Sequence, residues 1–148
     1  MPAPLPSTTE LVIRNEIAQL AILSEAMERI GEEHGLAPKT LFQMQIALDE
    51  MVSNVIKYAW PDGGDHEIRV RITASTGQVA IEIADDGRPF NPLAAPEPPQ
   101  PPPGRRPRPG GVGIHMLKQF MEKIEYARID GQNRLTLTKL CDIGAPNQ

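Results

Sequence analysis

Apolar and polar side chains alternate along this chain with two different periods, and each period predicts one kind of element. Apolar side chains three and four positions apart predict a helix over residues 15–34 and a second over residues 38–59. Asn15 is expected to cap the first helix, and Pro38 to lie in the first turn of the second. The first helix is expected to bury Ile17, Leu20, Met27 and Ile30. The second is expected to bury Leu41, Met44, Leu48, Met51, Val52, Val55 and Ala59.

Alternation with a period of two predicts strands elsewhere. Residues 68–72 and 79–83 are typical of an antiparallel hairpin, because a short polar turn with a glycine separates them. Two closing strands are expected at residues 124–129 and 134–140, and a short first strand at residues 11–13. A third helix, at residues 114–123, is expected to bury Ile114, Leu117, Phe120 and Met121.

One segment has neither period. Residues 91–109 hold nine of the 16 prolines and almost no apolar side chains. Proline lacks a backbone donor and disfavours helix in the residue before it, so an extended, solvated loop is expected here. This segment cannot contribute to a hydrophobic core.

Composition narrows the function classes. The 148 residues, 40% of them hydrophobic, predict one domain over residues 1–148. A net charge of -4 without a basic stripe argues against a nucleic-acid partner. The single cysteine, Cys141, and the lack of a targeting segment at the start predict a cytoplasmic protein. No apolar run reaches the roughly 18 residues that a membrane span needs, so no membrane association is expected.

The second predicted helix carries the first candidate for chemistry. Glu50 and Asn54 are four positions apart, so they are expected to face the same space, about 6 Å apart along the axis. A carboxylate can take a proton from an attacking hydroxyl, and an amide oxygen suits Mg²⁺ held against phosphates. Taken alone, the pair is also typical of a solvated helix flank.

A second candidate follows the predicted hairpin. Asp85 ends a buried strand, and Gly87 comes two positions later. A carboxylate there can accept a hydrogen bond from the exocyclic amine of adenine, and the glycine lets the backbone approach the ring. The plainer interpretation is an ordinary turn.

The third candidate is a glycine cluster before the third helix. Small residues at positions 110–113 would expose backbone N–H groups at a helix N-terminus, where phosphate oxygens bind. The cluster is not a Walker A sequence, and by itself it is a weak signal.

In this order, the three motifs resemble the N, G1 and G2 boxes of the GHKL ATP-binding fold, which gyrase, histidine kinases and MutL share. The match is most similar to the small bacterial anti-sigma factors with serine kinase activity, and it runs over residues 9–140. The resemblance implies an α+β, two-layer sandwich of the Bergerat type. Its sheet would be mixed and mostly antiparallel, with about five strands and three helices on one face.

The resemblance also assigns roles to individual residues. It implies that Glu50 is the general base, Asn54 the ligand of Mg²⁺ and Asp85 the carboxylate that recognises adenine. It implies further nucleotide contacts from four small or apolar residues, Gly87, Gly111, Val112 and Gly113.

Two other regions of the chain bear on that assignment. Residues 91–109 occupy the position of the lid that closes over the nucleotide in the family. There Arg105, Arg106 and Arg108 are expected either to reach the triphosphate or to serve solubility. Asn133 stands where many relatives have a threonine near the adenine pocket, and it departs from the family pattern. His34 and His66 are expected on the surface.

The function that the resemblance implies is binding of Mg-ATP and transfer of its γ-phosphoryl group to a serine. The implied partners are a sigma factor, which the protein sequesters, and an anti-anti-sigma antagonist, which it phosphorylates. A homodimer is expected as well, although no surface for it can be identified from the sequence.

Three alternatives stay open. The protein could bind nucleotide and a regulator without catalysis. It could be the ATPase part of a histidine kinase, which the short stretch before Pro38 disfavours because a phospho-accepting helical hairpin has no room there. It could also be a structural α+β domain whose motifs are accidental.

Overall fold

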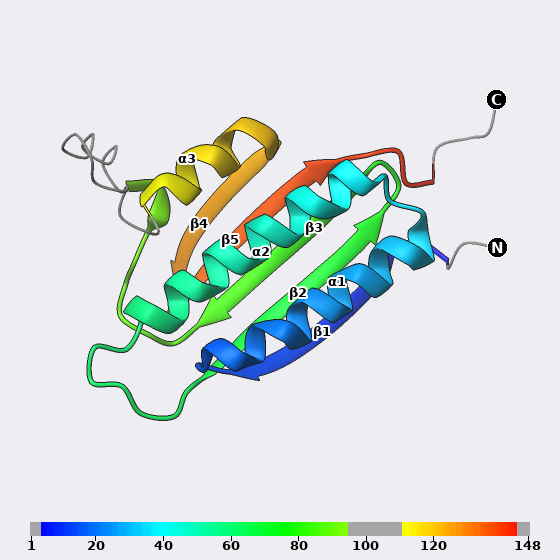
Figure 1. The fold of residues 1–148 in the computed structure, drawn as a ribbon. Helices are drawn as coiled ribbons and strands as arrows, with labels where there is room; N and C mark the ends of the chain where they lie inside the picture. Colours follow the sequence, from blue (N-terminus) through cyan, green and yellow to red (C-terminus); the bar gives the residue numbers. More distant parts are fainter. Residues whose placement is uncertain (1–3, 95–110, 145–148) are drawn as a thin grey trace, which may run out of the picture.

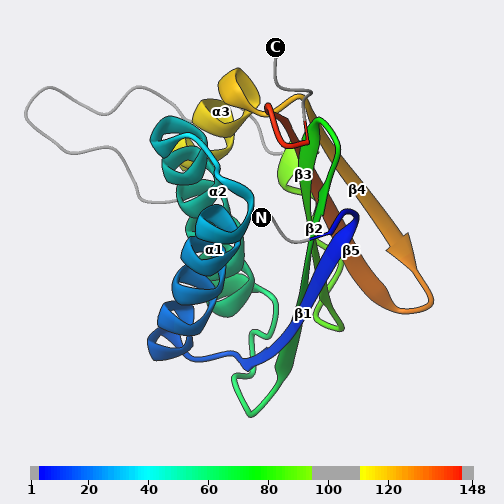
Figure 2. The same ribbon diagram turned by 90° about the vertical axis from the view of Figure 1, so that its right-hand side faces the viewer.

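Three α-helices cover one face of a five-stranded sheet in the computed structural model, which describes residues 4–94 and 111–144 (Figure 1, Figure 2). In Figure 2 the helices lie together on one side of the sheet. The strand order is β1-β2-β3-β5-β4, and every pairing of the described strands is antiparallel. The predicted α+β two-layer architecture is confirmed, with a sheet that is antiparallel throughout rather than mixed.

The strands are β1 Ser7–Arg14, β2 Glu67–Ser75, β3 Gln78–Asp85, β4 Lys123–Ile129 and β5 Gln132–Leu140. The α-helices are α1 Leu20–His34, α2 Pro38–Tyr58 and α3 Gly111–Phe120. Two short 3₁₀ turns, η1 Ile17–Gln19 and η2 Pro92–Ala94, join them. The strands predicted as two hairpins are all present, each extended by one to three residues at one or both ends.

Helix α2 is the long central helix that carries much of the candidate site. Pro38 begins it, because a missing N–H costs nothing in a first turn. Gly35 ends α1 in the left-handed conformation, with φ at 64°, which glycine adopts without strain. The buried stripe of α2 contains Met44, Leu48, Met51 and Val52, as the periodicity predicts, and also Ala47. The predicted Leu41 and Val55 are only half-buried.

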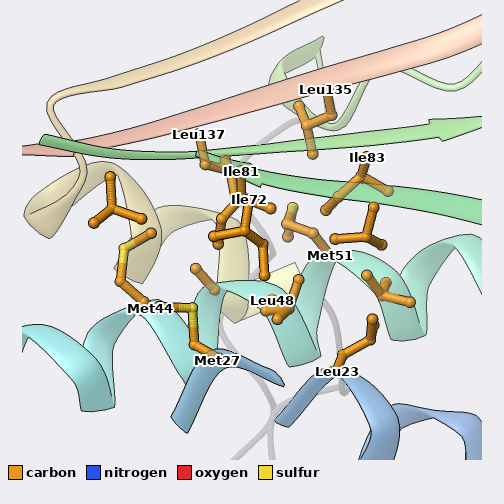
Figure 3. Packing of buried hydrophobic residues seen from close by; sticks show 14 of the residues in the cluster. Leu23, Met27, Met44, Leu48, Met51, Ile72, Ile81, Ile83, Leu135 and Leu137 are labelled. Carbon is orange, nitrogen blue, oxygen red and sulfur yellow. The ribbon is translucent and has the colours of Figure 1, made fainter. Parts of the chain in front are cut away.

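The core fills the space between the helices and the sheet (Figure 3). Met44, Leu48 and Met51 of α2 point toward the sheet. There they pack against branched side chains of β2, β3 and β5. Burying one such side chain contributes about 1.5–3 kcal/mol. The sheet residues labelled in this packing are Ile72, Ile81, Ile83, Leu135 and Leu137.

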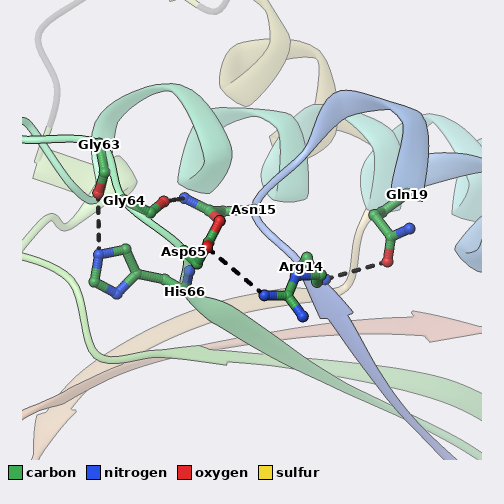
Figure 4. A network of polar contacts seen from close by, with 7 residues as sticks. All are labelled: Arg14, Asn15, Gln19, Gly63, Gly64, Asp65 and His66. Carbon is green, nitrogen blue, oxygen red and sulfur yellow. Dashed lines mark hydrogen bonds and ion pairs between the residues drawn. The ribbon is translucent and has the colours of Figure 1, made fainter.

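Asn15 does not cap the first helix, which corrects one prediction. Its amide Nδ2 donates to the Gly64 carbonyl oxygen, and its Oδ1 accepts from the His66 N–H, each at 3.0 Å (Figure 4). The asparagine thus joins the end of β1 to the loop before β2. Because this loop takes the amide, α1 begins only at Leu20, and Ile17 is 53% exposed rather than buried.

The third helix is shifted by three residues from its predicted range. It covers Gly111–Phe120, because Lys123 already pairs with Thr138 in the sheet. The expected extended loop at residues 91–109 falls mostly outside the described residues. Its described part contains the 3₁₀ turn Pro92–Ala94, because the Asn91 side chain accepts a hydrogen bond from the Leu93 N–H at 2.9 Å.

His34 lies in the interior rather than on the surface, which is a further correction. It is 7% exposed, at the last position of α1, on the same face as Met27 and Ile30. Neither ring nitrogen has a hydrogen-bond partner among the described residues. Of the helices that the structure describes, none has the length and apolar character to cross a membrane.

Candidate nucleotide-binding site

The end of β3, the beginning of β5 and the second half of α2 meet at a small pocket. Its apolar walls come from Met51, Val55, Ile83 and Leu135, and its polar groups come from Asn54, Asp85 and Asn133. Asp85 and Asn133 are directly paired across β3 and β5. The fold therefore brings together Asn54 and Asp85, which are 31 positions apart in the sequence.

Asp85 is the buried carboxylate of this pocket, with 5% of its surface exposed. Its Oδ1 accepts two hydrogen bonds, from the Gly87 N–H at 2.9 Å and from Asn133 Nδ2 at 3.0 Å. Burial raises the pKa of Asp85 above its usual value of 3.8, against the lowering effect of these hydrogen bonds and of Arg128. Both bonds go to Oδ1, so Oδ2 is the oxygen left for another donor.

Asn133 is the most connected side chain of the pocket. Its Nδ2 donates to Asp85 Oδ1 and to the Arg88 carbonyl oxygen, the latter at 2.8 Å. Its Oδ1 accepts from the Phe90 N–H at 3.2 Å and from the Tyr126 hydroxyl. Asn133 thus ties β3, β4 and β5 to the loop after β3.

The cavity that remains has a volume of about 30 Å³. That is the share of one water molecule in the liquid, whereas pockets for small ligands usually measure about 300–1,000 Å³. The hydrogen bonds of Asn133 and the side chains of Phe90 and Pro92 enclose this space. A nucleotide base can enter only after some of these groups move.

Asn54 is 7% exposed and lines the same pocket. None of the hydrogen bonds of the pocket described above uses its amide. An amide oxygen is a suitable Mg²⁺ ligand when phosphate oxygens and water complete the octahedron. Among the described residues, no group of three or more His, Cys, Asp or Glu could hold a metal alone. The donor set therefore fits a Mg²⁺ ion brought in with a phosphate.

Gly87 is required here by space rather than by backbone conformation. A Cβ atom added at Gly87 would lie 2.5 Å from Ala59 Cβ and 2.6 Å from the Ala59 carbonyl oxygen. The same carbonyl accepts a hydrogen bond from the Arg88 N–H at 2.9 Å. Arg128 also donates to the Gly87 carbonyl oxygen at 2.7 Å. The glycine lets the loop after β3 pack against the end of α2.

Glu50 does not line this pocket. It lies one helical turn before Asn54, partly buried, and it lines a separate groove between α1 and α2. The two neighbouring residues therefore line different hollows, and their joint action on one ligand stays a prediction. A helical wheel gives their relative angle, but the neighbouring elements decide which hollow each residue lines.

The glycine cluster begins α3, beside α2. Gly111, Val112 and Gly113 form the first turn of this ten-residue helix. The free N–H groups of such a turn, together with the helix dipole, attract anions. Gly110 and the three arginines at positions 105, 106 and 108 lie outside the described residues, so their predicted roles stay predictions.

Sequence reasoning missed two residues of the site and gave a third no role. Tyr126 and Arg128, on β4, point their polar ends at Asn133 and at the Gly87 carbonyl. Their positions alternate along a strand, which is a signal, but only the strand order reveals that β4 reaches the pocket. Asn133 was recognised only as a departure from a family pattern.

Comparison with known proteins gives three results. The pattern of the histidine kinase-like ATPase domain matches residues 13–139. The chain is 30% identical over 112 residues to serine/threonine-protein kinase BtrW of Bordetella bronchiseptica, an alignment that covers 76% of this chain and 79% of that protein. The crystal structure of the RsbU and RsbW domains of Rv1364c from Mycobacterium tuberculosis matches 90% of this chain with a TM-score of 0.61. At 14% identity, and with this chain spanning 32% of that one, this match shows a shared fold.

Proposed function

Because this chain belongs to the histidine kinase-like ATPase domain family, we propose that it binds Mg-ATP and transfers the γ-phosphoryl group to a serine of a partner protein. The observation that supports this most is the pocket that Asn54 and Asp85 share. The similarity to a serine/threonine-protein kinase supports the choice of acceptor.

In this proposal, Asp85 recognises the base. Its Oδ2 accepts a hydrogen bond from the exocyclic amine of adenine, while Oδ1 stays bonded to the Gly87 N–H. The apolar side chains of Met51, Val55 and Ile83 pack against the ring. Asn133 then exchanges part of its present hydrogen bonds for contacts with the nucleotide or with water.

Asn54 and the first turn of α3 hold the phosphates. The Asn54 amide oxygen is the protein ligand of Mg²⁺, which neutralises charge on the phosphate oxygens. Gly111, Val112 and Gly113 offer backbone N–H groups at the helix N-terminus. Alignment and charge neutralisation supply most of the rate in phosphoryl transfer, so these residues are positioning groups.

Glu50 acts as the general base. It accepts the proton of the serine hydroxyl while the serine oxygen bonds to the γ-phosphorus. The bond between that phosphorus and the β–γ bridging oxygen breaks, and ADP leaves. Glu50 lies about 6 Å along the helix axis from Asn54, on the side of α1, from which the hydroxyl would approach.

The proposed biological role is that of an anti-sigma factor. The protein would sequester a sigma factor in the cytoplasm and release it when an anti-anti-sigma antagonist binds, and phosphorylation of that antagonist would reverse the exchange. A homodimer is part of the same proposal. The similarity to a serine/threonine-protein kinase over most of both chains is its main support.

The test uses purified protein, Mg-ATP labelled at the γ-phosphate and candidate antagonist proteins from the same organism. Phosphoserine in one antagonist, mapped by mass spectrometry and absent with Glu50→Gln, is the expected result. Protein that does not bind Mg-ATP in calorimetry would refute the proposal.

A second candidate is a regulatory module that binds nucleotide and a protein without catalysis. The observation that favours it is the position of Glu50 outside the pocket. It predicts tight Mg-ATP binding and nucleotide-dependent binding of a partner. It also predicts no phosphoserine in any antagonist, and identical behaviour of Glu50→Gln and the wild type.

A further inference from the structure

A groove of about 300 Å³ runs between α1 and α2 and ends beside Glu50. One wall is a second stripe of α2, distinct from its core stripe, because its members recur three and four positions apart. That stripe consists of Phe42, Gln45, Ile46, Asp49 and Glu50. Leu20, Leu23 and Ser24 of α1 form the other wall.

Phe42 is the most unusual residue of this groove. It is 62% exposed, more than any other large apolar side chain among the described residues. Single exposed apolar residues are common, but this one stands in a groove whose walls are also apolar, through Leu20, Leu23 and Ile46. The arrangement fits a receiving site for an apolar side chain.

The charge of the groove points to the kind of partner. Its two ionisable lining residues are Asp49 and Glu50, and no Lys or Arg of the described chain lines it. Both carboxylates are at the same end. A segment that carries a lysine or arginine near this end would be attracted, and an acidic one repelled.

We propose that this groove docks the acceptor segment of the phosphorylated protein, with the serine at Glu50 and an apolar side chain against Phe42. The inference rests on the proposed kinase function and adds the features of its substrate. Glu50 and Phe42 are eight residues apart, about 12 Å along the helix. An extended peptide covers that distance in about four residues. The acceptor therefore carries leucine or phenylalanine four positions from the serine, with a basic residue beside the serine.

The experiment uses fluorescent 13-residue peptides with a central serine and a lysine next to it. In one series, each peptide carries a single leucine at a different one of the remaining positions. In the matched series, alanine stands at that position. Binding to the full chain with Mg-ATP is followed by polarisation. We expect leucine to improve affinity about tenfold or more at one position four residues from the serine. Replacing the lysine by glutamate should weaken peptide binding, because the groove carries two carboxylates.

Phe42→Ala is the decisive variant. It should lose the preference for leucine over alanine while it still binds Mg-ATP, since Phe42 lies outside the pocket. Leu140→Ala is the matched control, because Leu140 is 53% exposed and does not line the groove. It should keep the full preference.

Other results separate the two ideas. A chain that binds Mg-ATP but favours no leucine position, or keeps its preference with Phe42→Ala, overturns the docking inference alone. A chain that binds no Mg-ATP overturns the proposed function. If Phe42→Ala instead turns a dimer into a monomer in sedimentation velocity, the groove is an interface between two copies, and the inference is wrong.

Discussion

The pocket and the groove lie along the same helix, yet they are built in opposite ways. The pocket holds about 30 Å³, and Asp85 and Asn133 are bonded to each other inside it. The groove holds about 300 Å³, and its aromatic residue, Phe42, is mostly exposed. The comparison teaches that residues one turn apart on α2 can line two hollows of very different size and polarity.

The difference follows from what packs against each half of α2. Its last turn is held by the loop after β3. Arg88 donates through its backbone N–H to the Ala59 carbonyl and through Nε to the Tyr58 carbonyl, and Trp60 Nε1 donates to Asp86 Oδ1 at 3.2 Å. Basic donors at helix carbonyls also suit the dipole. Beside the stripe from Phe42 to Glu50, the described part of the chain places only α1, so a groove remains.

Glu50→Gln tests the comparison most strongly. We expect the rate of phosphoryl transfer to fall about 10²–10⁴-fold, because the base is lost while the shape is kept. The dissociation constant of Mg-ATP should stay the same, since Glu50 does not line the pocket. Single-turnover transfer and calorimetry measure the two quantities.

Glu33→Gln is the control for that variant, since Glu33 is an exposed carboxylate near the end of α1. It should behave as the wild type in both measurements. An unchanged transfer rate with Glu50→Gln would remove Glu50 from the mechanism.

Asp85→Asn should weaken nucleotide binding without unfolding the pocket. The new amide oxygen can keep both bonds of Oδ1, from Gly87 and Asn133, but an NH₂ group replaces Oδ2 and cannot accept from adenine. A hydrogen bond to a charged group contributes about 1.5–3 kcal/mol, so affinity for ATP should fall about 10–100-fold. Equal ATP affinity in calorimetry would contradict this role.

The same variant gives a test by pH. Burial raises the pKa of Asp85 above 3.8, so the folded state holds this proton more tightly than the unfolded state. The stability that this provides is present below pH 3.8 and is lost as pH rises through the raised pKa. In urea unfolding, the wild type should therefore lose stability relative to Asp85→Asn over that range. A constant difference at all pH values would be inconsistent with the raised pKa.

Gly87→Ala should destabilise the region around the pocket and leave the groove between α1 and α2 unchanged. The new Cβ would overlap the backbone oxygen and the Cβ of Ala59, neither of which can rotate away. We expect a loss of about 1–3 kcal/mol in the free energy of unfolding, as for other overpacked sites. Urea unfolding measures it, and the loss should be accompanied by weaker ATP binding.

Gly31→Ala provides the contrast within the same chain. Its added Cβ would meet the tip of Leu41 at 3.1 Å, a flexible side chain that can move. Alanine is also favoured over glycine in a helix by about 1 kcal/mol. This variant should be close to neutral, and equal losses for both substitutions would show that the contact with Ala59 is not what Gly87 provides.

His34→Leu should change the stability slightly and affect neither the pocket nor the groove. Both ring nitrogens of His34 are buried without partners among the described residues, which usually costs about 1–3 kcal/mol. Leucine fills a similar space without polar atoms, so we expect stability to rise by about 1 kcal/mol. Thermal unfolding should show the gain, with ATP binding unchanged. A loss of stability would mean that the ring has a partner.

The sequence predicted most of the fold because the periodicity of the core is strong. The stripe of α2 and the alternation of β2 and β3 are both determined by burial on one face, so they can be recognised without the structure. The family, inferred from three motifs, is confirmed by the match over residues 13–139. Asn15 was predicted wrongly, because its partners are 49 and 51 positions away.

The site was predictable in its residue types and not in its geometry. Asp85 and Asn54 could be chosen from motifs, and the fold brings both to one pocket, while their roles stay predictions. Neither the separate groove of Glu50 nor the contact of Gly87 with Ala59 could be foreseen, because both depend on which element lies beside α2. Local spacing contains no such information.

Asn133 already forms hydrogen bonds inside the pocket that a nucleotide base would have to replace. Its amide already bonds Asp85 Oδ1, the Arg88 carbonyl oxygen and the Phe90 N–H, so a base that enters has to displace some of these bonds before it reaches Asp85 Oδ2. The free energy of ATP binding is then the difference between the bonds formed with the nucleotide and the bonds of Asn133 that are lost. Shortening the Asn133 side chain would remove the amide that competes with the base for these partners.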